Sequence, residues 1–295
     1  MKTLFLRSPA KLNLWLEVIE KRKDGYHNIE SIIDTVSLYD RITLKESPGR
    51  IEVSLIKNSA SVDGTGLPQE KNLAYQAALL LKSELKINQG VRIKIEKHIP
   101  LSSGLGGGSS NAATTLLGLN KLWRINLPSE RLLGLATKLG SDVPFFLKKG
   151  RCLVKGRGEM IFPLSPFPKI WYVIVVPEIR VSTETVYHQL CLNLTKRKNR
   201  IKILSALDKG NLEKMGKYLF NRLEEVSLKK YPEIKDFKKT LRKSGALGAL
   251  MSGSGGSLFG IARSKEDASG IASRLKRGKV FVVESKEGRD SDEQD

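Results

Sequence analysis

A run of glycines and serines in the first half of the chain has the composition of an anion-binding loop. From residue 99 to residue 113 it is Ile-Pro-Leu-Ser-Ser-Gly-Leu-Gly-Gly-Gly-Ser-Ser-Asn-Ala-Ala. Glycines let the backbone approach a ligand without an intervening Cβ, and serines offer hydroxyl groups and a helix cap. A helix that begins here directs its free N–H groups and the positive end of its dipole at one point. The stretch therefore predicts binding of a phosphate or a nucleotide.

The glycine run fits poorly to a Walker A loop, a dinucleotide-binding fingerprint or a flexible linker. A Walker A loop requires a lysine directly after its last glycine, whereas Ser109 and Ser110 follow Gly108. A dinucleotide-binding fingerprint requires Gly or Ala five residues after its first glycine, and counting from Gly104 that position is Ser109. A flexible linker would not separate an apolar alternating segment from an apolar helical one.

Four polar residues elsewhere could also do chemistry. Lys11 starts an alternating segment, Tyr26 and His27 follow an Asp-Gly turn signal, and Asp142 precedes Val-Pro-Phe-Phe. Considered alone, they are explained as a strand-edge lysine, two turn residues and a turn-capping carboxylate. An aromatic ring can nevertheless stack on a base, and an imidazole can both donate to and accept from a base edge.

Strands and helices that the apolar pattern predicts must position these residues. Alternation predicts a strand from Leu12 to about residue 19 and another over residues 91–95, directly before the glycine loop. The apolar run at 171–176 predicts a buried strand. Helical spacing predicts helices over residues 72–85, 112–123, 129–140, 201–207, 212–226 and 232–242. Ser129 is expected to cap the third of these, and Ser264 to open a capping box.

The composition is that of a globular chain long enough for two domains. It has 295 residues, 40% of them hydrophobic, and no apolar run long enough to span a membrane. No secretory leader is predicted either, so a cytoplasmic location without membrane contact is expected. Cysteines and histidines lack ligand spacing, which predicts neither disulfides nor a histidine metal site. We expect one domain over residues 1–162, a second over 163–287 and a disordered tail over 288–295.

The formal net charge of +20 would attract polyanions to any fold. Lysines are spread through every segment, however, and only 6% of the residues are aromatic. Both features differ from a nucleic-acid-binding footprint. We therefore favour a solvated basic surface that collects anionic substrates over specific nucleic-acid binding.

Three separated motifs resemble the signatures of the GHMP kinases, a family of small-molecule kinases. The first is Pro-Ala-Lys-Leu-Asn-Leu at residues 9–14 with Arg-Lys-Asp-Gly-Tyr-His at 22–27; the second is the glycine loop from Pro100; the third is the glycine loop at 246–259. The third is equally explained as a tight hairpin turn. In addition, Leu-Gly-Ser-Asp-Val-Pro-Phe-Phe at 139–146 is similar to the segment that carries the family's catalytic aspartate.

The resemblance implies a two-domain α+β fold, with a first domain like domain 2 of ribosomal protein S5 and an active site between the domains. The Tyr-His pair is typical of the branch that phosphorylates the 2-hydroxyl of 4-diphosphocytidyl-2-C-methyl-D-erythritol in isoprenoid synthesis without mevalonate. ATP and Mg²⁺ are the implied cofactors. Asp142 is the implied general base, and Lys11 is expected to stabilise charge on the attacking oxygen.

The resemblance also implies two sets of binding residues. Those for ATP are Asn72, Lys97, Pro100, Leu101, Ser102, Ser103, Gly104, Leu105, Gly106, Gly107, Gly108, Ser109 and Ser110. Those for the cytidyl substrate are Asn13, Tyr26, His27, Thr183 and Tyr187, with the Tyr187 ring as the second face of a sandwich around the base. No metal ligand other than a serine hydroxyl is suggested.

Several alternatives stay open at this point. Asn72 is equally explained as a helix cap, and Lys97 as a solvent-facing strand lysine. A sister GHMP kinase acting on another alcohol would account for the glycine loops. A basic RNA-binding protein with an S5-like fold and no catalysis would account for the charge.

Overall fold

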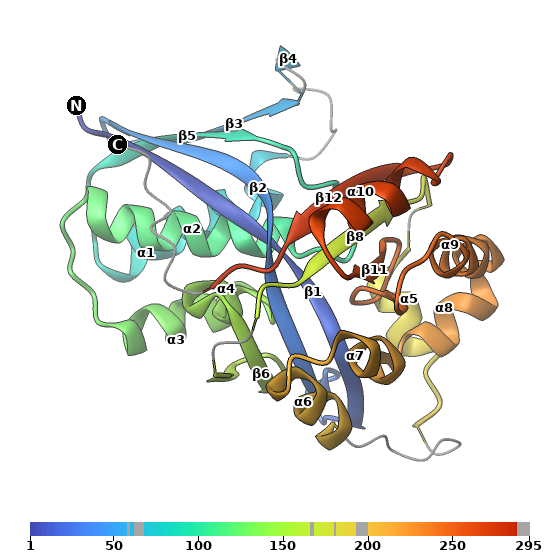
Figure 1. Cartoon of the computed structure of the whole chain (residues 1–295). Coiled ribbons are helices and arrows are strands. Elements are labelled where there is room, and N and C mark those ends of the chain that lie inside the picture. The colour runs from blue at the N-terminus through green and yellow to red at the C-terminus, as the bar shows by residue number, and fades with distance from the viewer. Residues whose placement is uncertain (58–59, 62–67, 166–167, 180, 193–199, 288–295) are drawn as a thin grey trace.

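Two β-sheets, each covered by helices, meet along a pair of long antiparallel strands, β1 (Thr3–Lys21) and β2 (His27–Ser47) (Figure 1). The computed structural model describes residues 1–57, 60–61, 68–165, 168–179, 181–192 and 200–287. The other strands are β3 (Ile51–Lys57), β4 (Ala60–Ser61), β5 (Gly90–Glu96), β6 (Arg151–Gly156), β7 (Met160–Pro163), β8 (Trp171–Val176), β9 (Phe220–Asn221), β10 (Ala249–Met251), β11 (Leu258–Ala262) and β12 (Lys279–Glu284). The helices are the 3₁₀ turn η1 (Gln69–Lys71), α1 (Leu73–Glu84), α2 (Gly107–Leu122), α3 (Ser129–Leu139), α4 (Val143–Lys148), α5 (Thr183–His188), α6 (Ile201–Asp208), α7 (Leu212–Tyr218), α8 (Glu224–Lys230), α9 (Pro232–Lys243) and α10 (Lys265–Ser273).

The first sheet has the strand order β4-β3-β5-β2-β1-β9, with β6 beside β2 and β7 beside β6. Side chains from one of its faces, such as Ile42, Leu44 and Ile93, form a core with α1, α2, α3 and α4. The pairing of β1 with β2 shifts register between Pro9 and Ala10 and between Asn13 and Trp15. Such irregularities re-aim side chains, and here they bracket the segment that carries Lys11 and Asn13.

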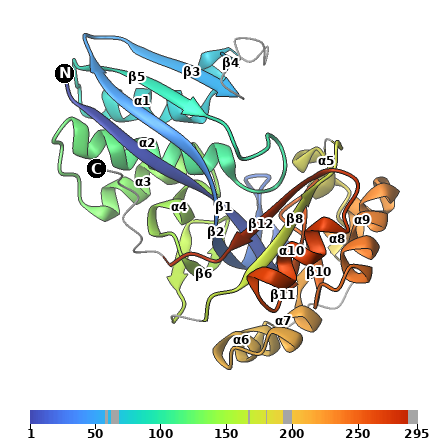
Figure 2. The same cartoon turned by 45° about the horizontal axis from the view of Figure 1, so that its top comes forward.

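The second sheet has the order β10-β11-β8-β12, and β8 at its centre is buried on both faces, as the sequence predicts. Tyr172 and Ile174 face a core shared with β1, β2, α6 and α7. Val173 and Val175 face the opposite way, onto α9 and α10. Because successive residues of a strand alternate between faces, this one strand joins two cores. Figure 2 shows the second sheet with α10 across it, next to the crossing of β1 and β2.

The α+β fold class is confirmed, and two predicted boundaries are wrong. The expected helix over 212–226 is two helices, α7 and α8, because Phe220 and Asn221 pair in parallel with Trp15 and Leu16 of β1. That pairing overrides local helical propensity. The first strand begins at Thr3 rather than at Leu12.

The caps are a mixture of correct and incorrect predictions. Ser264 does cap α10, accepting a hydrogen bond from the backbone N–H of Asp267. Ser129 is the first residue of α3 rather than its cap, which is Pro128.

The domain boundary predicted after residue 162 falls within β7, and the tail over 288–295 lies outside the described residues. Within the described ranges, no helix is both long and apolar enough to cross a bilayer.

Candidate active site

A cavity of about 1730 Å³ opens where the two sheets meet, and most of the predicted site residues line it. Its walls come from segments far apart in the sequence: β1, the β1–β2 turn, the glycine loop, the turn before α4, α5 and the β10–β11 hairpin. The predicted residues that line it are Lys11, Asn13, Tyr26, His27, Lys97, Pro100, Leu101, Ser102, Ser103, Gly104, Gly106, Gly107, Gly108, Ser109, Asp142, Thr183 and Tyr187.

The glycine loop enters α2 without a side-chain cap. Gly106 is the N-cap residue with a φ of 72°, in the left-handed region that favours glycine. The first turn, Gly107 to Ser109, lines the cavity, so its backbone N–H groups and the positive helix end face the open space. Such a geometry suits an anion, and binding of a phosphate here stays a prediction.

The loop is held from behind by the hairpin between β10 and β11. Ser252 Oγ donates to the carbonyl of Gly104 at 3.1 Å, and Ser257 donates to the carbonyl of Ser103 through its backbone N–H at 3.1 Å. A Cβ on Gly104 would lie 2.3 Å from the Ser252 carbonyl oxygen, so no other residue fits at this position. The glycine motif at 246–259 is therefore a hairpin turn, and it also supports the glycine loop that begins at Pro100.

Lys97 is not a solvent-facing strand lysine. Its ammonium forms an ion pair with the carboxylate of Asp40, and the side chains are 8% and 0% exposed. Asp40 Oδ1 also accepts the backbone N–H groups of His98 and Ile99, at 2.8 and 2.9 Å. One buried carboxylate thus fixes both the lysine and the entry to the glycine loop.

Lys11 and Asp142 meet in the floor of the cavity. Lys11 Nζ lies 3.4 Å from Asp142 Oδ2; the lysine side chain is 4% exposed and the aspartate side chain 38%. Asp142 is the N-cap residue of α4, yet its side chain makes no capping hydrogen bond, so the carboxylate remains directed at the cavity. The backbone N–H of Lys11 donates to the carbonyl of Leu105, which ties this pair to the glycine loop.

A chain of hydrogen bonds orients Lys11. Its ammonium donates to Asn13 Oδ1 at 2.5 Å, Asn13 Nδ2 donates to Ser31 Oγ at 2.9 Å, and Ser31 Oγ donates to the Trp15 carbonyl at 2.8 Å. A hydroxyl has a single proton, which here goes to Trp15, so Ser31 must accept from the asparagine. The Asn13 amide is thereby held with its oxygen toward the ammonium.

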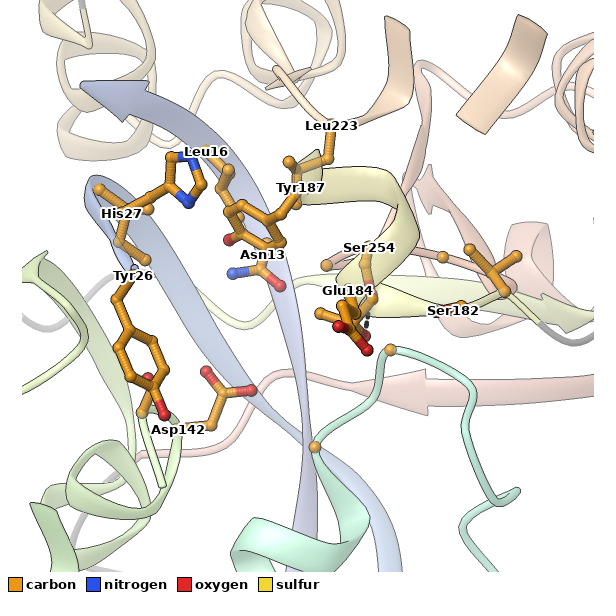
Figure 3. A pocket seen from close by; sticks show the side chains of 18 of the residues that line it. Asn13, Leu16, Tyr26, His27, Asp142, Ser182, Glu184, Tyr187, Leu223 and Ser254 are labelled. Carbon is orange, nitrogen blue, oxygen red and sulfur yellow. Dashed lines mark hydrogen bonds between the residues drawn. The ribbon is translucent and has the colours of Figure 1, made fainter. Parts of the chain in front are cut away.

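Three rings line the opposite end of the cavity. Tyr26 ends the β1–β2 turn, His27 is the first residue of β2, and the Tyr187 ring projects toward His27 from α5 (Figure 3). The rings of His27 and Tyr187 are already in contact, with centroids 5.1 Å apart. A base between two rings would separate them by about 7 Å, twice a van der Waals spacing. At this spacing no base fits between the rings of His27 and Tyr187.

The electrostatic environment favours neutral rings at this end. Burial lowers the pKa of His27 below its ordinary value of 6.5, with smaller contributions from Lys21 and His188. Burial raises the pKa of Tyr187, and the charge of Asp142 raises it further. At neutral pH the imidazole is uncharged, so it can donate one hydrogen bond and accept another.

Three predicted ATP residues do not line the cavity. Asn72 caps α1, since its side chain accepts the backbone N–H of Ala74, so the structure favours a capping role. Ser110 is buried, and its hydroxyl is hydrogen-bonded to Ser8 Oγ at 2.8 Å. Leu105 is fully buried in the core beneath the loop. A helix or loop exposes only one of its sides to the cavity. A sequence motif therefore contains residues that pack behind the loop as well as residues that line the cavity.

Sequence reasoning missed other residues at the site. Arg157 and Ser254 line the cavity, while Asp40 and Ser31 act behind it. Thr183 Oγ1 and Ser254 Oγ lie 2.7 Å apart and join α5 to the hairpin loop. Of these residues, only Arg157 has a sequence context that could have indicated a site, because it is a charged residue between two glycines. The others are identified only by their contacts in the folded chain.

The cavity lining includes carboxylate and hydroxyl oxygens that a metal ion could use. Among the described residues, no three His, Cys, Asp or Glu side chains cluster as a metal cage. Ser109 and the Asp142 carboxylate do line the same cavity. In phosphate-transferring sites Mg²⁺ is typically held by one or two carboxylates together with substrate phosphates and water. The donor set fits an ion held in that manner.

Comparisons with known proteins agree on one family. Residues 72–150 match the model of the GHMP kinases N terminal domain, and residues 203–279 match that of the GHMP kinases C terminal domain. A 4-diphosphocytidyl-2-C-methyl-D-erythritol kinase of Geobacillus kaustophilus is 43% identical over 259 residues, 88% of either chain. The corresponding protein of Caldicellulosiruptor bescii is 42% identical over 281 residues, 95% of either chain.

Solved structures give the same result. A crystal structure of 4-(cytidine 5'-diphospho)-2C-methyl-D-erythritol kinase superposes with a TM-score of 0.79 at 34% identity, covering 96% of this chain and 99% of that one. Homoserine kinase from Cytophaga hutchinsonii has a TM-score of 0.75 at 22% identity, covering 98% and 96%. The second likeness concerns the fold alone.

Proposed function

Because the chain belongs to the GHMP kinase family, we propose that it phosphorylates the 2-hydroxyl of 4-diphosphocytidyl-2-C-methyl-D-erythritol with ATP, in the synthesis of isoprenoid precursors. Relatives named for this activity cover nearly the whole chain, and the cavity has a phosphate end and an aromatic end. The observation that carries the chemistry is the pair of Lys11 and Asp142, 3.4 Å apart beside the glycine loop.

In this proposal Asp142 is the general base. Its carboxylate accepts the proton of the substrate hydroxyl while the hydroxyl oxygen attacks the γ-phosphorus of ATP. The new oxygen–phosphorus bond forms as the bond from the γ-phosphorus to the bridging oxygen breaks, and ADP leaves with that electron pair. Lys11, oriented by Asn13, stabilises the negative charge that develops on the attacking oxygen.

The glycine loop is the proposed site of the triphosphate. The uncapped first turn of α2 offers backbone N–H groups, and Lys97 adds a fixed positive charge beside Gly107. When bound, Mg²⁺ would neutralise the phosphates, and the Ser109 hydroxyl is one protein oxygen at the first turn of α2 that could hold it. Mg²⁺ dependence is thus part of the proposal, and the cytoplasmic location stays a prediction.

The cytidine is proposed to bind at the aromatic end. Its ring would stack between Tyr26 and Tyr187, while neutral His27 reads the base edge. Thr183, joined to Ser254, holds α5 and hence Tyr187 at this place. A kinase for mevalonate or homoserine would have no base for these rings to bind.

The test is ADP release with three alcohols under identical conditions: the cytidyl substrate, mevalonate and homoserine. Turnover with the cytidyl substrate alone, and a new monophosphate in the ³¹P spectrum of the product, are expected. Comparable kcat/KM with another alcohol would identify a sister kinase. Salt-sensitive RNA binding without any ATP turnover would favour the RNA-binding alternative instead.

A further inference from the structure

The turn between β6 and β7 brings a cation to the aromatic end of the cavity. It consists of Gly156, Arg157, Gly158 and Glu159, and β6 pairs with β2 so that Gly156 lies opposite Ile29. The turn therefore lies beside the start of β2, where Tyr26 and His27 are. Arg157 lines the cavity, although the proposed mechanism gives it no role.

The guanidinium of Arg157 lies over one face of the Tyr26 ring, with its central carbon 4.4 Å from the ring centroid. This is within the range of a cation–π contact, which holds a ring by its face. Tyr26 is 51% exposed and its backbone N–H donates to Asp24 Oδ1 at 3.1 Å. One face of the ring is thus covered by Arg157, and the base must use the other.

Arg157 is itself anchored on both sides. Its Nη2 donates to the carbonyl of Thr137, at the end of α3, at 2.9 Å. Its backbone N–H donates to Glu159 Oε2 at 2.7 Å. A guanidinium held in this way loses little further freedom when it restrains a neighbouring ring.

The same turn supports the catalytic carboxylate. Gly158 has a φ of 133°, and a Cβ there would lie 2.1 Å from the carbonyl oxygen of Ser141, the residue before Asp142. The backbone of the turn is therefore packed directly against the segment that carries Asp142. One short connection contacts both the ring proposed for the base and the support of the proposed general base.

We infer that Arg157 is a positioning residue for recognition of the cytidine. It clamps Tyr26 in the orientation that leaves a single face open to a nucleobase, and so it determines the affinity for the nucleotide end of the phosphoryl acceptor. The inference rests on the proposed function, because it needs a base-bearing acceptor, and it concerns binding of that acceptor rather than of ATP.

The test compares Arg157→Ala and Arg157→Lys with the wild type, alone and combined with Tyr26→Ala. Arg157→Ala should raise the KM for the cytidyl substrate about three- to tenfold, as expected for loss of a cation–π contact. The KM for ATP should change less than twofold. In the Tyr26→Ala background, Arg157→Ala should add less than a twofold effect, because the contact it removes is already absent.

Arg7→Ala is the matched control. Arg7 lies over the Tyr39 ring at 5.8 Å and does not line the cavity, so both KM values should stay unchanged. An equal rise of both KM values in Arg157→Ala, or an effect of full size in the Tyr26→Ala background, would overturn the inference. Arg157→Lys keeps the charge and serves if the alanine variant does not fold.

Failure of the proposed function gives a different result. A wild-type protein without turnover of the cytidyl substrate contradicts that function but leaves the contact open to measurement. Calorimetric titration of the same variants with CDP then provides the readout: weaker binding in Arg157→Ala that depends on Tyr26 supports the inference, and unchanged binding overturns it.

Discussion

The ammonium of Lys11 lies 3.4 Å from the carboxylate of Asp142, and of the two only the lysine is buried. Lys11 comes from the middle of β1, whereas Asp142 precedes α4, so only the tertiary fold brings them together. An exposed carboxylate beside a buried cation can reach a bound hydroxyl while its charge is balanced. The first prediction tests this pair.

Asp142→Asn should lower kcat by about 10²- to 10⁴-fold, because an amide cannot take the hydroxyl proton. The KM for ATP should change little, since the glycine loop does not depend on this side chain. Steady-state kinetics measure kcat and KM, and a thermal unfolding curve shows whether the variant is folded. A variant that keeps more than a tenth of the wild-type kcat would refute the role of Asp142 as general base.

Ser31→Ala should lower kcat on the order of tenfold while leaving both KM values near those of the wild type. Without the hydroxyl, the Asn13 amide is no longer held with its oxygen toward Lys11. Ser37→Ala is the control: it lies on the same strand and also loses a hydrogen bond, to Glu284, but away from the cavity. Equal kcat values in the two variants would show that the chain of hydrogen bonds from Ser31 through Asn13 to Lys11 does not affect catalysis.

Asp40→Asn should raise the KM for ATP several-fold and lower the free energy of unfolding by about 3 kcal/mol, because it leaves Lys97 buried without its partner. Chemical denaturation and initial rates test the two effects. Glu52→Gln removes an exposed partner of Arg92 and should cost less than about 1 kcal/mol. Similar losses in both variants would contradict the special position of Asp40.

The pH dependence of substrate binding should reflect His27, whose pKa lies below 6.5 in the folded chain because of burial. As the pH falls, His27 therefore becomes protonated in the unfolded chain at a higher pH than in the folded chain. Its contribution to stability is complete above about pH 6.5 and declines below that value. The KM for the cytidyl substrate should rise only at still lower pH, where His27 becomes charged. An NMR titration of the imidazole that gives a pKa above 6.5 would disprove this.

Gly104→Ala should lower the free energy of unfolding and weaken ATP binding. Its φ of 76° disfavours a side chain, and the new Cβ would collide with the Ser252 backbone. Gly134→Ala, in the middle of α3 with no atom within 4 Å of the new Cβ, should instead stabilise the protein by about 0.5–1 kcal/mol. If Gly104→Ala is as stable as the wild type, the close approach of the two loops is not required.

Short stretches of sequence were sufficient to predict several elements of this protein and its family. Glycine spacing between a strand and a helix is enough to predict an anion site, because backbone N–H groups at a helix start need no distant partner. The continuous apolar run at 171–176 likewise predicted β8, and Ser264 predicted the cap of α10. The motifs predicted the family, since each one carries its residues within a few positions of one another.

Only the tertiary structure decided which motif residues contact the cavity and which support it. Ser110 belongs to the same glycine loop as Ser109, and the resemblance also implies ATP binding by Asn72. Ser110 is nevertheless buried against Ser8, and Asn72 caps α1. The break at Phe220 likewise depends on pairing with β1. Such choices are made by partners distant in the chain, whose packing and hydrogen bonds outweigh local preference, so no window of sequence contains them.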